Sequence, residues 1–162
     1  MPDLELREPA ERVSPRARLM WLVGAGFEGA VAIAVLVVVG YVWAPFDLSW
    51  WVPVAFGVLL VAYVVVVPRW KYAVHRWEVT DTAVYTQTGW WTRERRIAPL
   101  SRIQTVDYSE GALERAFSLA SVTVTTASAA GALRIAALDK QLARRLAEEL
   151  TLKADTVPGD AT

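Results

Sequence analysis

Two long apolar runs in the first half of the chain constrain its fold most. Residues 19–43 read LMWLVGAGFEGAVAIAVLVVVGYVW, with Glu28 as their only charge, and residues 50–67 read WWVPVAFGVLLVAYVVVV, with none. A helix needs about 20 apolar residues to cross the hydrocarbon core of a bilayer, and the second run is barely long enough. The alternative is two helices buried in a soluble core, but such helices rarely lack a polar stripe. The pattern therefore predicts a transmembrane helical hairpin over residues 19–68.

The basic residues around this hairpin predict its orientation. They precede the first run or follow the second, and the connector 44–49 has none; they are Arg12, Arg16, Arg18, Arg69, Lys71 and Arg76. The positive-inside rule then places both termini in the cytoplasm, in a multi-pass protein of the cytoplasmic membrane. A signal peptide is the alternative for the first run, but the run is too long and no small-x-small cleavage site follows it.

Two features of the first run allow more than one interpretation. Glu28 is costly in lipid, which makes it a candidate intramembrane polar site. The other interpretation is that it lies in the inner leaflet and reaches water or an arginine. Gly26, Ala30 and Ala34 recur every four residues, a spacing that lets helix backbones approach closely. They indicate a packing face against the second helix or against another chain.

After Pro68 the pattern changes to short alternating segments. Strands are predicted over residues 70–79, 82–88, 92–100, 101–108, 121–127 and 133–138, with a loop and one helical turn over 111–119. Asp139 is a good N-cap for a final amphipathic helix, whose buried face is predicted to be Leu142, Leu146 and Leu150. The expected class is α+β: a bent antiparallel sheet or partial barrel over residues 69–153, closed by that helix. Residues 1–18 are expected to form a disordered polar tail, and residues 154–162 a flexible one.

Three segments of this second half resemble a known family. Ile97-Ala-Pro-Leu-Ser-Arg-Ile-Gln-Thr-Val-Asp107, Gly111-Ala-Leu-Glu-Arg-Ala-Phe-Ser-Leu119 and a Val-Thr-Val-Thr-Thr-Ala strand follow one another. Together with the two preceding apolar runs, they resemble the YdbS-like bacterial pleckstrin-homology membrane proteins over residues 19–153. The resemblance implies a pleckstrin-homology fold behind two membrane helices. Ser118 stands where that family usually has Gly, so a positive φ there would strain this chain.

The residues for catalysis or metal binding are scarce. The chain has no cysteine and one histidine, His75, which excludes a disulfide scaffold or thiolate metal site and argues against a Ser-His-Asp triad. His75 is expected to pack rather than act as a base. Seventeen basic residues balance seventeen acidic ones, which argues against nucleic-acid binding. We therefore expect no enzyme, no cofactor and no metal.

The central motif carries charges for which we expect a structural role. Asp107 and Glu114 are close in sequence to Arg102 and Arg115. We expect these side chains to pair, or the arginines to cap loop carbonyls, and so to fix the loop rather than bind a ligand.

One segment is a candidate contact surface. Trp90, Trp91, Arg93, Arg95 and Arg96 follow a turn at Gly89. Adjacent strand residues face opposite ways, so one tryptophan should be exposed if the other is in the core. Tryptophan beside arginine suits an anionic membrane surface or an acidic protein partner. The alternative is a solvated turn in which one tryptophan caps the core.

These features together predict a membrane-anchored, non-enzymatic interaction module at the cytoplasmic face, acting through protein–protein contacts. Its partner would be a membrane protein or a second copy of the chain, in addition to the lipid bilayer itself. The alternatives are recognition of anionic lipid by the pleckstrin-homology-like domain, or an accessory subunit of a transport or envelope-stress system. The accessory-subunit alternative rests on Glu28 alone.

Overall fold

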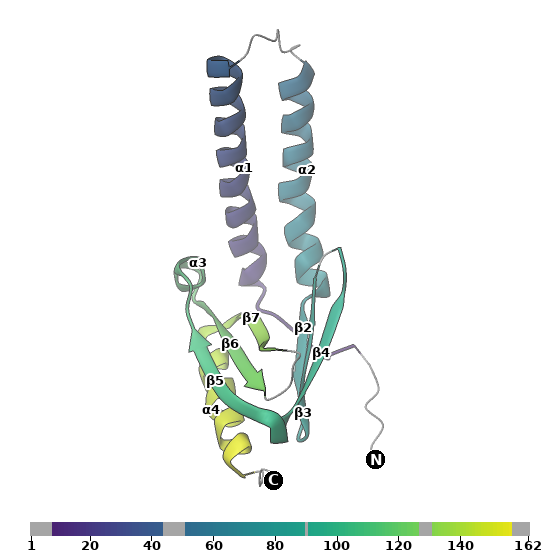
Figure 1. The fold of residues 1–162 in the computed structure, drawn as a ribbon, viewed down its shortest axis with the longest axis vertical. Coiled ribbons are helices and arrows are strands. Elements are labelled where there is room, and N and C mark those ends of the chain that lie inside the picture. Colours follow the sequence, from purple (N-terminus) through teal and green to yellow (C-terminus); the bar gives the residue numbers. More distant parts are fainter. Residues whose placement is uncertain (1–7, 44–50, 90, 127–130, 157–162) are drawn as a thin grey trace.

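Two helices stand side by side on one end of a small β domain (Figure 1). They are α1 (Arg16–Trp43) and α2 (Trp51–Val74) in a computed structural model that describes residues 8–43, 51–89, 91–126 and 131–156. Both are long and apolar enough to cross a membrane, and only 6% and 11% of their apolar windows are buried. Helices of a soluble core would be covered, so this exposure contradicts the soluble-core alternative. The connector 44–49 lies outside the described residues.

Helix α2 extends further than predicted. The residues 70–74 were expected to begin a strand, but they continue the helix through Pro68 to Val74. The helical bonding reaches His75, whose backbone N–H donates to the carbonyl oxygen of Lys71 at 2.8 Å. The alternation of aromatic and β-branched residues resembled a strand, but these residues are a direct extension of the membrane helix. The first strand of the domain therefore starts at Arg76.

Two antiparallel sheets form the body of the domain, as Figure 1 shows. One has the strand order β1-β2-β3-β4 and the other β5-β6-β7. A 3₁₀ turn joins β4 to β5, and the short helix α3 joins β5 to β6. The bounds are β1 Glu11–Arg12, β2 Arg76–Val79, β3 Ala83–Thr88, β4 Glu94–Pro99, η1 Leu100–Arg102, β5 Ile103–Ser109, α3 Ala112–Ala116, β6 Leu119–Thr126 and β7 Leu133–Asp139. The predicted bent antiparallel arrangement is confirmed. The predicted helical turn is also confirmed: it is α3, in the connection between β5 and β6.

The described segment before α1, residues 8–15, is part of the domain, which corrects the prediction of a disordered tail there; residues 1–7 of that tail lie outside the described residues. Strand β1 pairs with β2, and the Trp77 indole donates to the carbonyl oxygen of Arg12 at 3.3 Å. The backbone N–H of Ser14 then donates to the carbonyl oxygen of Ala137 on β7 at 3.1 Å. The segment thus bridges the two sheets, and Val13 enters the core beside Ala17 of the first turn of α1. The polar composition of the segment did not indicate this role, because the role depends on one apolar side chain and on backbone hydrogen bonds.

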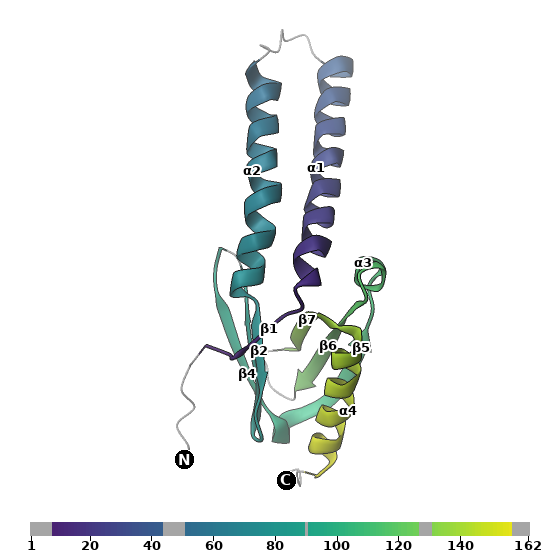
Figure 2. The ribbon, with the colours of Figure 1, turned by 180° about the vertical axis from the view of Figure 1, so that it is seen from behind.

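The C-terminal helix α4 (Lys140–Thr156) covers the second sheet (Figure 2). Asp139 caps it, because its Oδ1 accepts from the backbone N–H of Gln141 at 3.1 Å. Leu146 and Leu150 are buried as predicted, but Leu142 is 42% exposed. Ala143 takes the buried position instead, because the covered stripe runs through positions 143, 146 and 150. The helix extends to Thr156, three residues past the predicted end of the domain.

Within the described parts of the chain, two residues other than glycine adopt left-handed backbone conformations. Ser118 has φ 56° at the end of α3, and Ala137 has φ 57° within β7. The prediction that Ser118 occupies a position suited to Gly is confirmed. Its carbonyl oxygen accepts from the backbone N–H of Lys140 at 3.1 Å, which ties the turn to the start of α4. The left-handed region is unfavourable for a residue with a Cβ, so this turn is strained.

Candidate functional site

The β3–β4 hairpin carries the predicted contact surface. The end of β3 and the start of β4 lie beside the last turns of α2 in both views of the ribbon (Figures 1 and 2). Gly89 turns the chain with φ 107°, and a Cβ there would overlap the carbonyl oxygen of Thr92, so this position requires glycine. Trp91 is 87% exposed, whereas Trp90 lies outside the described residues. An indole is thus presented to the surroundings at the level where the membrane helix enters the domain.

The arginines of the hairpin are held by partners in the same domain. Arg93 and Arg95 both approach the carboxylate of Glu8, at 3.8 and 3.5 Å. Arg95 Nε also donates to Gln87 Oε1 at 2.9 Å, and the buried Gln87 donates to the carbonyl oxygen of Val74 at 3.0 Å. This chain of contacts connects the hairpin to the last residue of α2. These contacts therefore hold the hairpin surface in a fixed position relative to the end of α2.

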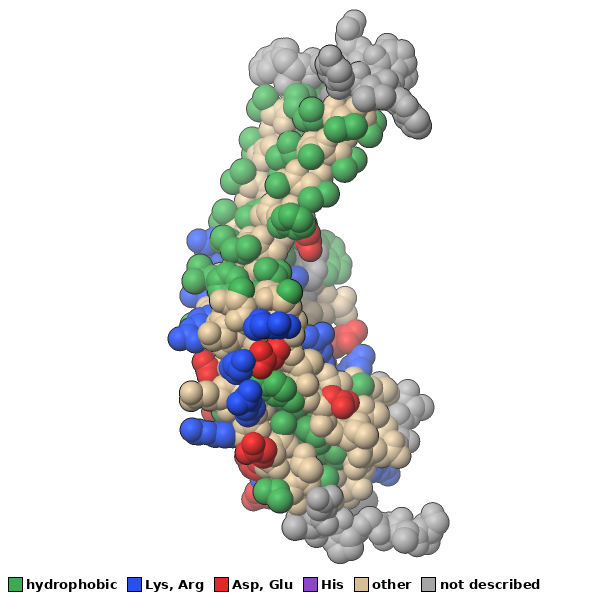
Figure 3. Space-filling model, turned by 90° about the vertical axis from the view of Figure 1, so that its left-hand side faces the viewer, with side chains coloured by type: hydrophobic (Ala, Val, Ile, Leu, Met, Phe, Trp, Pro, Cys, Tyr) green, Lys and Arg blue, Asp and Glu red, His purple; other side chains and the backbone are tan. Residues whose placement is uncertain are grey.

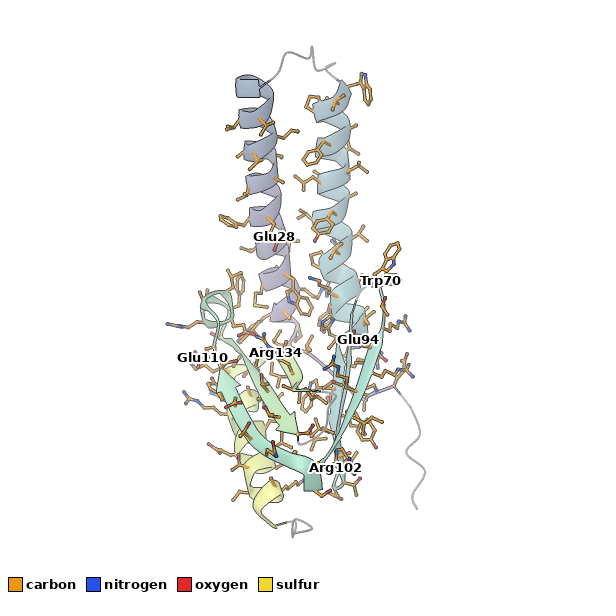
Figure 4. All side chains as sticks on the ribbon, in the orientation of Figure 1. Glu28, Trp70, Glu94, Arg102, Glu110 and Arg134 are labelled. Atoms are coloured by element: carbon orange, nitrogen blue, oxygen red, sulfur yellow. The ribbon has the colours of Figure 1, made fainter. Side chains whose placement is uncertain are left out.

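Arg96 is held differently. It approaches Glu94 at 3.4 Å and donates to the carbonyl oxygen of Ala132 at 3.3 Å. Figure 4 shows Glu94 on β4, with Trp70 of α2 at the level of the hairpin end. The hairpin surface thus contains two carboxylates, Glu8 and Glu94, among its three arginines. Its charge is mixed: Glu94 belongs to the segment itself, and the structure adds Glu8 from the start of the chain.

Strand β4 is the edge of the first sheet, paired only with β3 among the described strands. Its residues 94–96 are all exposed, so both faces and the outer side of the strand reach solvent at this end. Edge strands offer backbone donors and acceptors to an added strand, and charged side chains restrict which strand can pair. The exposed indole thus lies next to an edge that a peptide segment can extend.

Glu28 lines a cavity of about 440 Å³ between the two helices and the domain. Tyr63 and Lys71 of α2 line the same cavity, as do Leu113 of α3 and Arg134 of β7. Figure 4 shows Glu28 on α1 with Arg134 below the base of that helix, and Figure 3 shows the hollow where the apolar stem joins the domain. Sequence reasoning found Glu28 but not this cavity, because Arg134 lies 106 positions further along the chain.

The small residues of α1 divide into two faces. Gly29, one residue past Glu28, packs on α2: a Cβ there would lie 2.9 Å from Leu60 Cδ1. Gly26 has nothing within 4 Å, and Ala30 and Ala34 are exposed. Of the two predicted uses of this stripe, packing against α2 is therefore wrong. The predicted contact of the stripe with another chain stays a prediction.

The charges of the central motif pair differently from the prediction. Glu114 is buried, and its carboxylate accepts from the backbone N–H of Gly111 and from the Ser121 hydroxyl; it also approaches Arg134 at 3.6 Å. Arg134 donates to the same Ser121 hydroxyl at 3.1 Å. Sequence proximity suggested Arg102 and Arg115 as partners, but the β6–β7 pairing brings Arg134 closer.

A second pair, Glu110 and Lys140, joins β5 to α4. Their charged atoms lie 2.9 Å apart, and the Tyr108 hydroxyl donates to the same carboxylate. The hydrogen bond from Tyr108, followed by that from Lys140, lowers the pKa of Glu110. Both clusters tie loops to neighbouring elements of the domain. The described residues contain no group of three or more histidines and carboxylates that could hold a metal ion.

His75 packs as expected, although it precedes β2 rather than lying on a strand. Its Nδ1 lies 2.8 Å from the carbonyl oxygen of Lys71, and its ring contacts Trp21. Burial is the main cause that lowers the pKa of His75, and the charge of Lys71 adds to it. The imidazole is thus packed at the junction of stem and domain.

Comparison with known proteins agrees with this architecture. The family model described as the bacterial PH domain matches residues 19–154, which include both apolar helices and the β domain. The chain belongs to the bacterial PH domain family. The UPF0699 transmembrane protein YdbS of Bacillus subtilis (strain 168) is 26% identical over 157 residues, which cover 94% of this chain and 98% of that protein. No solved structure is significantly similar.

Membership in the bacterial PH domain family confirms the predicted resemblance and the α+β fold. With the two exposed apolar helices, the likeness to a transmembrane protein also places this chain in a membrane.

Proposed function

We propose that this bacterial PH domain protein is a membrane-anchored, non-catalytic interaction module, and that it binds a protein partner at the cytoplasmic face of the membrane. One observation carries the proposal: Trp91 is 87% exposed at the end of a positioned hairpin. Tryptophan and arginine are the residues that most often dominate binding energy in protein interfaces. The partner can be a membrane protein or a second copy of this chain.

The neighbouring charges favour a protein over a lipid surface. Glu8 and Glu94 lie among the three arginines, so an anionic leaflet would meet both attraction and repulsion there. A partner protein can place its own charges to match this mixed pattern. The exposed edge of β4 adds backbone donors and acceptors that suit an extended peptide segment. The surface is thus suited to a partner with an apolar pocket and an adjacent strand.

Contact of the hairpin with anionic lipid is the second candidate, and one observation favours it. The hairpin end lies beside the last turns of α2, at the level of Trp70 (Figure 4). Tryptophan prefers the membrane interface, and each basic residue near an anionic leaflet contributes about 1 kcal/mol. Three arginines, partly neutralised, would orient the tethered domain without binding strongly.

Crosslinking in native membranes separates these functions. The full chain with Arg93 and Arg95 both changed to Ala is compared with wild type and with the control Arg144→Ala, Arg145→Ala, whose two arginines are exposed on α4. The proposal predicts crosslinked protein adducts that the hairpin variant loses and the control keeps. Adducts that are equal in all three chains would contradict it.

The lipid arm uses the full chain in nanodiscs. Because the chain has no cysteine, Thr92→Cys carries a single environment-sensitive fluorophore. Phosphatidylcholine discs are compared with discs that also contain phosphatidylglycerol. A salt-sensitive blue shift only with phosphatidylglycerol would favour the lipid candidate, and the same spectrum in both discs would favour the protein partner.

A further inference from the structure

We propose that a groove at the base of the membrane stem binds the phosphate of an anionic glycerophospholipid, of the phosphatidylglycerol type, from the leaflet on the domain side. The groove has a volume of about 320 Å³, in the range of pockets that hold small molecules. It is lined by Pro15, Arg18, Leu19, Leu22, Pro68 and Arg69. This site is separate from the hairpin surface and does not depend on the proposed protein partner.

The groove lies at the level where the apolar stem meets the domain. Arg18 directly precedes the apolar run of α1, and Arg69 follows that of α2 by two residues. Leu19 and Leu22 continue the groove along α1 toward the bilayer, and both are exposed. Figure 3 shows Lys and Arg side chains gathered where the apolar stem ends. A phospholipid of this leaflet places its phosphate at the same boundary and its acyl chains deeper.

The charge of the lining selects an anion. The described residues that line the groove include two arginines and no carboxylate. No described acidic residue forms an ion pair with Arg18 or Arg69, whereas the neighbouring Arg16 approaches Asp139 at 3.5 Å. Two positive charges in one groove repel each other, and an anion between them removes this cost. Basic pockets between membrane helices are typical sites for anionic lipid headgroups.

Contacts with α2 already direct both guanidinium groups. That of Arg18 lies 5.2 Å from the centre of the Tyr72 ring, about one turn past Arg69 toward the domain. Arg69 Nη1 donates to the carbonyl oxygen of Val65 at 2.7 Å, one turn back toward the bilayer. An arginine has five N–H donors, so each side chain keeps donors for a further acceptor. Arg18 therefore faces a phosphate from the domain side, and Arg69 faces it from the bilayer side.

The order of groups along the groove matches the order of groups in the lipid. From the bilayer to the domain, the apolar side chain of Leu22 is followed by the guanidinium groups of Arg69 and Arg18. Acyl chains, ester carbonyls and phosphate follow one another in the same direction, and both polar groups accept hydrogen bonds. The glycerol head beyond the phosphate is neutral. A zwitterionic lipid would instead place its ammonium on the domain side of the phosphate, next to Arg18, where like charges repel.

Native mass spectrometry of the full chain in detergent tests the site. Phosphatidylglycerol, phosphatidylcholine and phosphatidylethanolamine with identical acyl chains are titrated separately. We expect wild type to bind phosphatidylglycerol about tenfold more tightly than either zwitterionic lipid, because two cations act on its net charge. The double variant Arg18→Gln, Arg69→Gln should lose this preference. The double variant Arg18→Lys, Arg69→Lys keeps both charges and should retain most of it.

The matched control is Arg16→Gln, which removes the same charge from the same end of α1 but outside the groove. It should bind like wild type, and an equal loss in this control would reduce the groove to a general basic surface and overturn the proposal.

Three other results would also overturn it. They are equal wild-type affinity for the three lipids, a preference that survives in the double Gln variant, and a preference that is lost in Arg93→Ala, Arg95→Ala instead, which would place the lipid on the hairpin. Glycerol 3-phosphate, a soluble phosphate without acyl chains, should bind far more weakly than phosphatidylglycerol; equal affinity would reject a lipid as the occupant. Because the readout is lipid binding alone, failure here leaves the protein-partner proposal untouched.

Discussion

The rings of Trp21 and His75 lie with their centroids 5.1 Å apart and tilted by 54°. Trp21 belongs to the second turn of α1, and His75 is the residue between α2 and β2, so this contact joins both membrane helices to the domain. Arg18 links the two helices to each other just beside this contact, because its guanidinium lies 5.2 Å from the centre of the ring of Tyr72 on α2. The stem and the domain are thus coupled by packing as well as by the chain itself.

This contact predicts a pH dependence of stability. The pKa of His75 is lowered in the folded state, chiefly by burial, so the folded chain binds fewer protons than the unfolded chain when the imidazole titrates. The stabilisation is present above the ordinary histidine pKa of about 6.5 and is lost as the pH falls through the lower folded value. His75→Phe keeps an aromatic ring but cannot titrate. Between pH 7.5 and pH 5, thermal unfolding in detergent should shift less for this variant than for wild type. Identical shifts would show that His75 does not contribute.

The strained turn at Ser118 predicts a stabilising substitution. Its φ of 56° is unfavourable for serine but accessible to glycine, and the side chain is exposed. Ser118→Gly should raise the free energy of unfolding by about 0.5–1 kcal/mol, because the relieved strain exceeds the added entropy of the unfolded chain. The control is Ser101→Gly, an exposed serine in η1 without a positive φ, which should be neutral or destabilising. If both variants lose stability equally, the turn is not strained.

The corrected face of α4 predicts unequal effects for two leucines one turn apart. Leu146 is 4% exposed and Leu142 is 42% exposed. Leu146→Ala should cost about 2–5 kcal/mol, because it leaves a cavity over the second sheet. Leu142→Ala should cost less than about 1 kcal/mol, as expected of a surface change. Chemical denaturation of the full chain in detergent measures both. Equal losses would place the covered face of the helix elsewhere.

The basic residues below the stem predict that both termini and the domain are cytoplasmic. Figure 3 shows Lys and Arg side chains gathered where the apolar stem ends. Single cysteines at Ser49, Ser101 and Glu148 are introduced into the cysteine-free chain, and intact cells are treated with a membrane-impermeant maleimide. Only Ser49, in the connector outside the described residues, should react. Labelling at Ser101 or Glu148 before the cells are broken would invert the topology.

The sequence was sufficient for the membrane hairpin and for the succession of strands along the chain after it, because apolar run length and turn residues are local signals. The sequence was insufficient where the structure depends on packing between residues that are far apart in the chain. Residues 8–15 read as a polar tail, yet Val13 enters the core. The end of α2 read as a strand, because a β-branched and aromatic segment is ambiguous when it follows a helix directly. In α4, Leu142 lay close enough to the apolar stripe to be assigned to it.

The same difference between local signals and long-range contacts applies to the candidate sites. The two adjacent tryptophans predicted that one indole of the hairpin is exposed, without saying which, and Glu28 was recognisable as the only charge in its run. The partners of these residues could not be predicted. Glu8 reaches Arg93 only because β1 joins the first sheet, and Arg134 lies below Glu28 only because β7 ends the second. Such contacts depend on the order of strands across the sheets and not on distance along the chain.

Photo-crosslinking from position 91 tests the proposed protein contact most directly. A photoreactive amino acid replaces Trp91 in the full chain, and a matched chain carries it at Leu152, which is 66% exposed near the end of α4. After irradiation of native membranes, position 91 should yield a discrete protein adduct, with a second copy or another membrane protein, that position 152 does not. Adducts with lipid alone at position 91, or identical protein adducts at both positions, would contradict a protein interface at the hairpin.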